Sequence, residues 1–222
     1  EQNEEKLAPF IEAHVPSVAV PNALNGKAII ESSRQSVDKT CPEAAAFIRQ
    51  HCDAKVFISV SRLSPEKNLS MLLNAFKRLK ASRRKAVLVV VGDGAQRDTL
   101  QRQVTELGIA DVVLFVGHVR NPYPLIAAAD CLVLPSKYEG QGLVLLEAMV
   151  LHTYCIAADL PATREVLGAG HGKLVPVEIE PFFQALCLFV DKGWEVMKFD
   201  HENYDLDAIR KFKAVLGEAS GG

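Results

Sequence analysis

The sequence has 222 residues, 49% of them hydrophobic, which is enough to bury the core of one large domain. Its 25 Lys and Arg residues nearly balance 27 Asp and Glu residues, so the net charge of -2 gives no reason to expect nucleic acid as a partner. The 5 cysteines show no metal-ligand spacing and are typical of core thiols in a reducing cytosol.

Residues 1–50 show little periodicity, apart from a short strand that ends in a Pro-Asn turn within 15–27 and a helix or arm over 42–50. From residue 51 onward, short apolar runs alternate with helical patterns. We expect strands over 55–60, 86–91, 112–116, 131–135 and 154–158, and helices over 68–80, 98–108, 121–129 and 143–151. An amphipathic helix over 203–217 and a Gly-rich fray follow.

The alternation predicts an α/β fold with a doubly wound, Rossmann-like parallel sheet, because the strands are apolar on both faces and are separated by helices. We therefore expect three parts: an irregular N-terminal segment over 1–50 that packs on the domain, the Rossmann-like domain over 51–200, and a C-terminal helix and fray over 201–222. Ligands of such sheets bind beyond the carboxyl ends of the strands, so the loops after the strands are the candidate site.

The loop after the first buried strand carries two cations, Arg62 and Lys67, just ahead of a helix. Two cations with flexible reach can clamp a diphosphate leaving group and stabilise its developing negative charge. Alternatively, Arg62 and Lys67 are two ordinary surface cations without a ligand. The loop therefore supports a diphosphate site only in combination with the other loops.

The stretch "SKYEGQGLVLLEAM" over 136–149 joins a strand to a helix through a Gly-Gln-Gly turn. The glycines let a ligand approach the backbone, and the first turn of the helix offers unpaired N–H groups to a phosphate or to sugar hydroxyls. Glu147 is the ionisable residue inside an otherwise apolar run. Its carboxylate either faces solvent, pairs with a protein group, or accepts from a ligand such as a ribose diol.

Three weaker signals leave alternatives open. "VVVGDGAQRDTL" over 89–100 begins as a dinucleotide fingerprint does, which would fit a nicotinamide-dependent oxidoreductase, but Arg97 stands where the third glycine would be. Asp205 and Asp207 have a spacing that could hold a metal, and they are better explained as ordinary caps of the last helix. His118 follows a strand and either lines the site or is a loop histidine.

Four motifs occur in order: "VSRLSPEKNLSMLLNAF", "VVVGDG", "LFVGHVRNPYPLIAAADCLVLPS" and "PSKYEGQGLVLLEAM". Together they resemble the C-terminal, nucleotide-sugar-binding half of the retaining glycosyltransferases of family four, which have the GT-B fold. The similarity covers roughly residues 15–195.

The resemblance implies a nucleotide sugar such as a UDP-sugar as substrate, with no cofactor and no metal. Arg62, Lys67 and Glu139 would be the catalytic residues, with the two cations on the donor diphosphate and Glu139 on the donor sugar. Glu147 would take the ribose hydroxyls. The implied donor-binding set is Gly140, Gln141, Gly142 and Leu143 at the sugar, Glu147 at the ribose, and Val119 and Leu125 at the base.

The sequence departs from the family pattern at three places. Ser61 stands where the family usually has glycine, and Gln141 where it often has an aromatic residue. "LPATRE" over 160–165 replaces a glycine-rich turn. These departures concern the identity of the donor more than its class.

GT-B enzymes have two Rossmann-like halves, and ~50 residues before the first strand cannot supply the second. The resemblance thus implies a glycan or polymer acceptor held by a missing N-terminal domain, and an isolated chain that is inactive. The stretches "NPYP", "YEGQGLVLLEAM" and "FDHENYDLDAIRKF" also resemble segments of transferases in bacterial cell-surface polysaccharide or wall-polymer synthesis. We see no signal peptide or membrane span and expect a cytoplasmic protein, whose full-length form could associate peripherally with a membrane. A non-catalytic binding module of the same fold is an alternative.

Overall fold

The computed structural model describes residues 22–168 and 170–219. The chain divides into two compact units, and the larger one, Lys27–Phe199, contains the β-sheet. The smaller unit combines the two ends of the chain, of which residues 22–26 and 200–219 are described. All the residues predicted to bind the donor lie in the larger unit.

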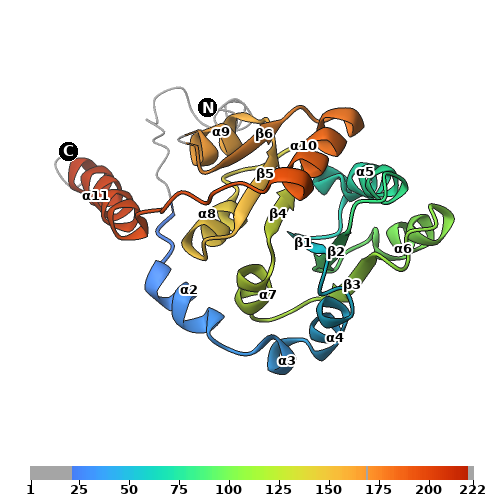
Figure 1. Cartoon of the computed structure of the whole chain (residues 1–222). Helices are drawn as coiled ribbons and strands as arrows, with labels where there is room; N and C mark the ends of the chain where they lie inside the picture. Colours follow the sequence, from blue (N-terminus) through green and yellow to red (C-terminus); the bar gives the residue numbers. More distant parts are fainter. Residues whose placement is uncertain (1–21, 169, 220–222) are drawn as a thin grey trace. The chain divides into compact units, whose positions relative to one another are not determined.

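Six parallel strands form one sheet in the order β3-β2-β1-β4-β5-β6 (Figure 1). The strands are β1 (Lys55–Val60), β2 (Ala86–Val91), β3 (Val113–Gly117), β4 (Cys131–Leu134), β5 (Tyr154–Ala158) and β6 (Gly172–Val175). The strand order reverses between β1 and β4, which is the point where open α/β sheets bind their ligands. The predicted Rossmann-like fold is confirmed.

Helices cover both faces of this sheet (Figure 1). One face carries α5 (Leu69–Ala81), α6 (Arg97–Glu106) and α10 (Ile179–Lys192), and the opposite face carries α4 (Pro42–Gln50), α7 (Tyr123–Ala128) and α8 (Leu143–Val150). The helix α9 (Pro161–Leu167) packs against β6 and α8. Every strand and helix that the periodicity predicts over 55–158 is present, with ends that differ by at most two residues.

The core follows from strands that are apolar on both faces. Phe57 of β1 meets Phe76 of α5 and Phe189 of α10 edge to face, each at 5.5 Å between ring centroids. Cys131 and Cys155 lie fully buried on neighbouring strands as free thiols, and burial raises the pKa of Cys155 to about 12. These two cysteines are the core thiols that the sequence predicts.

Within the N-terminal segment that is expected to be irregular, the predicted helix or arm over 42–50 is confirmed as a helix, and two further helices lie within 26–40. Residues 26–50 form α2 (Gly26–Ser33), α3 (Val37–Thr40) and α4. The helices α2 and α3 are eight and four residues long, too short for an apolar periodicity to be recognised in the sequence. The short strand expected within 15–27 falls mostly outside the described residues.

Three elements beyond residue 158 were not predicted: α9, β6 and α10. Residues 159–165, expected as a loop, largely belong to α9, whose start is capped by Thr163. The Thr163 hydroxyl accepts from the N–H of Leu160 at 3.0 Å and donates to the carbonyl of Ala158. The stretch that replaces the family's glycine-rich turn is therefore a capped helix.

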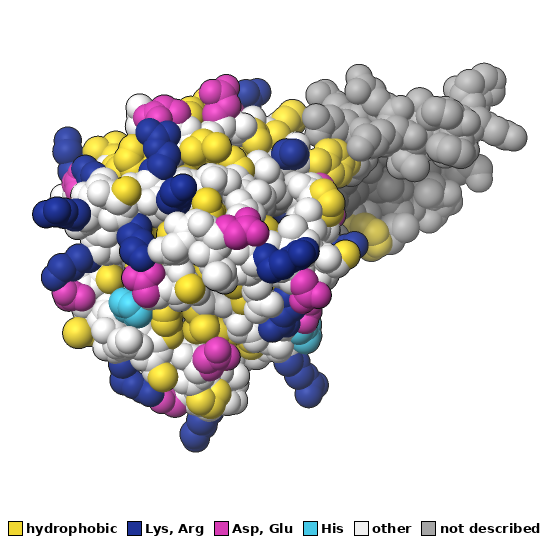
Figure 2. Space-filling model, turned by 90° about the vertical axis from the view of Figure 1, so that its right-hand side faces the viewer, with side chains coloured by type: hydrophobic (Ala, Val, Ile, Leu, Met, Phe, Trp, Pro, Cys, Tyr) yellow, Lys and Arg dark blue, Asp and Glu magenta, His cyan; other side chains and the backbone are white. Residues whose placement is uncertain are grey.

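The surface of the larger unit mixes charges of both signs. Lys and Arg side chains are interspersed with Asp and Glu on the face shown in Figure 2. Several of the cations are paired, such as Arg84 with Asp191 at 2.7 Å. Over the described part of the chain, no helix combines the length and apolar character needed to cross a membrane.

In the smaller unit, α11 (His201–Ala219) holds the stretch 22–26 through Asp205. The Asp205 carboxylate accepts from the N–H of Leu24 at 2.6 Å and from the N–H of Gly26 at 3.2 Å. Asp207 pairs with Arg210 at 3.2 Å. The Asp-x-Asp spacing therefore serves structural contacts, although Asp205 caps a neighbouring segment and not its own helix.

Candidate functional site

The loops that follow β1 and β4 are joined to each other where the strand order reverses. The short 3-10 turn η1 (Pro65–Lys67) leads into Asn68, whose side-chain amide donates to the carbonyl of Pro135 at 3.2 Å. The N–H of Lys137 donates to the carbonyl of Glu66 at 2.8 Å. Two segments about 70 residues apart in sequence thus form one surface at the carboxyl ends of neighbouring strands.

Lys67 and Glu139 form an ion pair across this junction. The ammonium of Lys67 lies 2.6 Å from Oε1 of Glu139, and the two side chains are 21% and 9% exposed. The hydroxyl of Ser136 donates to the same oxygen at 2.6 Å. Within the described residues, Oε2 of Glu139 has no hydrogen-bond partner, so this oxygen can accept from a ligand hydroxyl.

Arg62 is exposed immediately after β1, and its guanidinium pairs with no described residue. Arg62 and Lys67 belong to one turn, because the N–H of Ser64 donates to the carbonyl of Arg62 and the N–H of Lys67 donates to the carbonyl of Ser64, each at 3.0 Å. The Ser64 hydroxyl, with smaller contributions from the charges of Arg62 and Lys67, lowers the pKa of Glu66. The structure thus brings the three predicted catalytic residues to one loop junction. Of the two cations, Arg62 is the one whose guanidinium forms no ion pair with a described residue, so it can bind an anion directly.

The turn before α8 has the conformation that its glycines suggest. Gly142 is the N-cap of α8 with φ 66°, a left-handed conformation that favours glycine. A Cβ added at Gly140 would meet no atom within 4 Å, so this glycine leaves open space beside the backbone. Leu143 is 40% exposed at the start of α8. Gln141 is half-buried between the two glycines.

Glu147 lies half-buried on α8, and the protein itself supplies one partner. The hydroxyl of Tyr123 donates to Oε1 of Glu147 at 3.2 Å. Burial raises the pKa of Glu147, and the hydrogen bond from Tyr123 lowers it. The hypothesis that a ligand alone satisfies this carboxylate is therefore incomplete, because one of its oxygens is already bonded.

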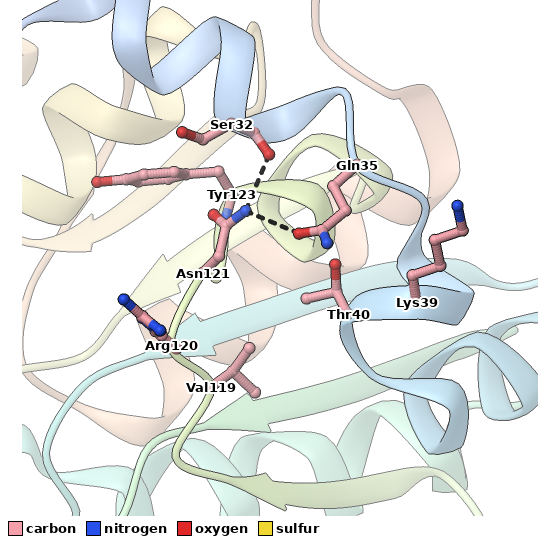
Figure 3. A pocket seen from close by; sticks show the side chains of 8 residues that line it. All are labelled: Ser32, Gln35, Lys39, Thr40, Val119, Arg120, Asn121 and Tyr123. Atoms are coloured by element: carbon pink, nitrogen blue, oxygen red, sulfur yellow. Dashed lines mark hydrogen bonds between the residues drawn. The ribbon is translucent and has the colours of Figure 1, made fainter.

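A groove of about 510 Å³ lies between the β3–α7 loop and the segment 32–40 (Figure 3). Val119 lines it, as predicted for a base-binding position, together with polar and cationic side chains. Leu125 does not, because its side chain is only 1% exposed in the core side of α7. A base bound in this groove would therefore not contact the Leu125 side chain. The lining residues are Ser32, Gln35, Lys39, Thr40, Val119, Arg120, Asn121 and Tyr123.

The Gly-x-Gly of the β2–α6 loop has a structural cause. A Cβ at Gly92 would lie 1.8 Å from the carbonyl oxygen of Ser61, and one at Gly94 would lie 2.5 Å from that of Leu63. Both glycines also have positive φ. They let this loop pack against the β1–α5 loop, so their presence needs no dinucleotide, and the oxidoreductase alternative loses its main support.

His118 is exposed and has no hydrogen bond to any described residue. Among the residues that the structure describes, no group of three or more His, Cys, Asp and Glu side chains lies close enough to hold a metal ion.

The family model for "Glycosyl transferases group 1" matches residues 44–191, which is more than half of the chain. The chain therefore belongs to this family, and the resemblance of its loops to family-four glycosyltransferases is confirmed.

Curated relatives extend well beyond the matched region. An uncharacterized glycosyltransferase of Methanocaldococcus jannaschii is 28% identical over 164 residues, 71% of this chain and 39% of that protein. N-acetylgalactosamine-N,N'-diacetylbacillosaminyl-diphospho-undecaprenol 4-alpha-N-acetylgalactosaminyltransferase of Campylobacter jejuni is 33% identical over 135 residues, 60% of this chain and 36% of that protein. The chain spans well under half the length of these relatives.

Solved structures share the fold. HepE of Anabaena in complex with UDP and glucose has a TM-score of 0.69 and 21% identity, covering 87% of this chain and 55% of that one. Sucrose-phosphate synthase from Thermosynechococcus elongatus has a TM-score of 0.76 and 21% identity, covering 100% of this chain and 57% of that one. The fold is one Rossmann-like half of a GT-B glycosyltransferase.

Sequence reasoning missed Ser136 and Tyr123, which contact the two glutamates. Ser136 precedes Glu139 by three residues in the same loop and could have been found as a local donor. Tyr123 lies 24 positions from Glu147 and reaches it only through the packing of α7 against α8. No local signal in the sequence points to that contact.

Proposed function

We propose that this chain binds a nucleotide sugar, such as a UDP-sugar, at the carboxyl ends of β1 and β4, as the donor half of a retaining, metal-independent glycosyltransferase. The observation that carries the proposal is the Lys67–Glu139 pair close to Arg62, at the point where the sheet's strand order reverses. A diphosphate bound at this position would lie beside two cations. Their positive charges would neutralise the diphosphate without a metal ion.

The two cations have different tasks in this proposal. Arg62 is exposed and has a planar guanidinium that can bond two phosphate oxygens at once. Lys67 is held by Glu139 and is mostly buried, so its charge is fixed in place before the ligand arrives. Together they stabilise the negative charge that develops on the diphosphate as the sugar leaves.

The remaining groups are assigned to the other parts of the donor. Glu139, with its free Oε2, and the backbone over 140–143 hold the sugar, where Gly140 leaves room for it. Glu147 accepts from the ribose hydroxyls, and Val119 contacts the base in the groove of Figure 3. A charge-assisted bond of this kind contributes about 1.5–3 kcal/mol.

The acceptor belongs to a part of the enzyme outside this chain. Relatives named for lipopolysaccharide core biosynthesis in Rhizobium meliloti and for a diphospho-undecaprenol-linked sugar in Campylobacter jejuni suggest a glycan or polymer acceptor of the bacterial cell envelope. Transfer needs an acceptor hydroxyl held near the anomeric carbon, and proximity of this kind accounts for much of catalysis. We therefore expect this chain alone to bind donor and to transfer no sugar.

A nucleotide sugar should raise the melting temperature of the chain in the presence of EDTA. At about 100 times its dissociation constant a ligand adds about 2.7 kcal/mol, which is about 5–10 °C for a domain of this size. The measurement is differential scanning fluorimetry with UDP-, GDP- and ADP-glucose, with EDTA or Mg²⁺, and with NAD.

Arg62→Ala should lose most of this shift, whereas Arg102→Ala, an exposed arginine on α6, should keep it. A shift with NAD and with none of the nucleotide sugars would overturn the proposal. A shift that needs Mg²⁺ would overturn its metal-independent part.

A further inference from the structure

Tyr123 connects the groove of Figure 3 to the carboxylate on α8. It is the first residue of α7, and its ring lines the groove together with Val119 and Asn121. Gln35 and Thr40 lie on one side of the groove, and the Tyr123 ring points away from them (Figure 3). Its hydroxyl reaches Oε1 of Glu147 at 3.2 Å. One side chain therefore touches both the space for a ligand and the group proposed to bind it.

The backbone at Tyr123 is held from both sides. Pro122 and Pro124 flank it, and Pro124 is buried. The side chain of Asn121 accepts from the N–H of Tyr123 at 3.4 Å and donates to the carbonyl of Ser32 at 2.9 Å and to Gln35 at 3.3 Å. These bonds tie the start of α7 to the end of α2, so the backbone that carries the Tyr123 side chain is held in place.

Glu147 depends on this contact. Among the described residues, Tyr123 is the one hydrogen-bond donor to its carboxylate, and only one of the two oxygens is bonded. A carboxylate on a helix can rotate about its side-chain torsions, and a bond to one oxygen fixes where the other points. The unbonded oxygen is then held ready for a ligand hydroxyl.

We propose that Tyr123 is a positioning residue of the donor site, whose hydroxyl orients the Glu147 carboxylate so that its free oxygen accepts from the vicinal hydroxyls of the ribose. This inference rests on the proposed function. Burial raises the pKa of Glu147, and the hydrogen bond from Tyr123 opposes this shift, so it favours the charged form of the carboxylate. The same contact thus serves orientation and ionisation.

Other titratable groups around α8 do not act on Glu147. The elements packed against it are α7, α9, β4 and β5. Burial and Tyr123 are the two causes of the shifted pKa of Glu147, and Arg164 on α9 is paired with Asp159. The titratable groups on those elements are Tyr123, Cys131, Tyr154, Cys155, Arg164 and Glu165.

The test compares Tyr123→Phe with the unmodified chain in UDP-glucose affinity, measured by titration calorimetry between pH 4.5 and 8. UDP-glucose is chosen because it carries no terminal phosphate that would titrate in this range. We expect affinity to be lost as the pH falls through the pKa of Glu147. Without the Tyr123 hydroxyl that pKa rises, so the loss should begin at higher pH. At pH 7.5 affinity should fall about fivefold, which corresponds to about 1 kcal/mol for one hydrogen bond.

Two variants serve as controls. Glu147→Gln should bind weakly at every pH and show no acid loss of this kind. Tyr154→Phe removes a hydroxyl that makes no hydrogen bond with the described residues, from a tyrosine whose ring stacks on Trp194, so this variant should titrate as the unmodified chain does.

The outcomes separate the inference from the function it rests on. If Tyr123→Phe and the unmodified chain lost affinity at the same pH, the positioning role would be overturned. This holds even if the variant had a lower melting temperature or a lower affinity at every pH. If the unmodified chain bound none of UDP-, GDP- and ADP-glucose at any pH, the proposed function and the inference would both fail. An acid loss that persists in Glu147→Gln would remove Glu147 from the ribose site and Tyr123 with it.

Discussion

Lys67→Ala is expected to weaken UDP-glucose binding by about 100-fold and to lower the free energy of unfolding by about 1–3 kcal/mol. The first effect follows from losing a cation proposed to bind the diphosphate. The second follows because Glu139, with a side chain only 9% exposed, would keep Ser136 as its one remaining donor among the described residues. Titration calorimetry and urea denaturation measure the two effects separately.

A double variant distinguishes binding from stability. Lys67→Ala combined with Glu139→Gln removes the unpaired charge, so stability should recover while affinity stays low. Lys55→Ala is the matched control, because Lys55 pairs with Asp130 at 2.7 Å at the opposite end of β1, where the two side chains are 42% and 32% exposed. We expect that control to change stability by less than about 1 kcal/mol and affinity not at all. Unchanged affinity in Lys67→Ala would contradict the diphosphate role.

Gly92→Ala is expected to destabilise the fold by more than about 4 kcal/mol or to prevent folding. The added Cβ would lie 1.8 Å from the backbone oxygen of Ser61, and Gly92 has φ 130°, where side chains are strained. The β1–α5 loop and the β2–α6 loop cannot move apart without losing a hydrogen bond, because the N–H of Leu63 donates to the carbonyl of Asp93 at 2.9 Å. Thermal and urea unfolding followed by circular dichroism would measure the loss.

Gly140→Ala is the matched control for this substitution. Its Cβ would meet nothing within 4 Å, and its backbone has no positive φ, so we expect a stability change of less than about 0.5 kcal/mol. If Gly92→Ala unfolded at the same temperature as the unmodified chain, the steric reason for this Gly-x-Gly would be wrong. The dinucleotide interpretation would then have to be considered again.

The central part of the fold could be predicted because its strands and helices are strongly patterned. The run 86–91 is apolar throughout and 69–81 has a clear 3.6-residue period, so both are found within a residue of their ends. The helix α4 coincides with the helix or arm predicted over 42–50, whereas α2 and α3 are only eight and four residues long. Helices this short contain too few residues for a periodic pattern to identify them.

The site was predictable to the level of its loops. The rule that ligands bind at the carboxyl ends of parallel strands identifies the segments of Arg62, Lys67 and Glu139. It does not show that Lys67 and Glu139 bond to each other, which depends on the distance between two loops. Nor does it show that the Leu125 side chain is buried, because an apolar residue beside a loop can face the groove or the core, and α7 is too short for its periodicity to decide.

The most direct test of the donor site is a crystal structure of this chain with UDP-glucose. The proposal predicts the diphosphate within hydrogen-bond distance of Arg62 and Lys67, the ribose hydroxyls on Glu147, and the base against Val119. A nucleotide bound elsewhere, or bound here without contact to either cation, would contradict it.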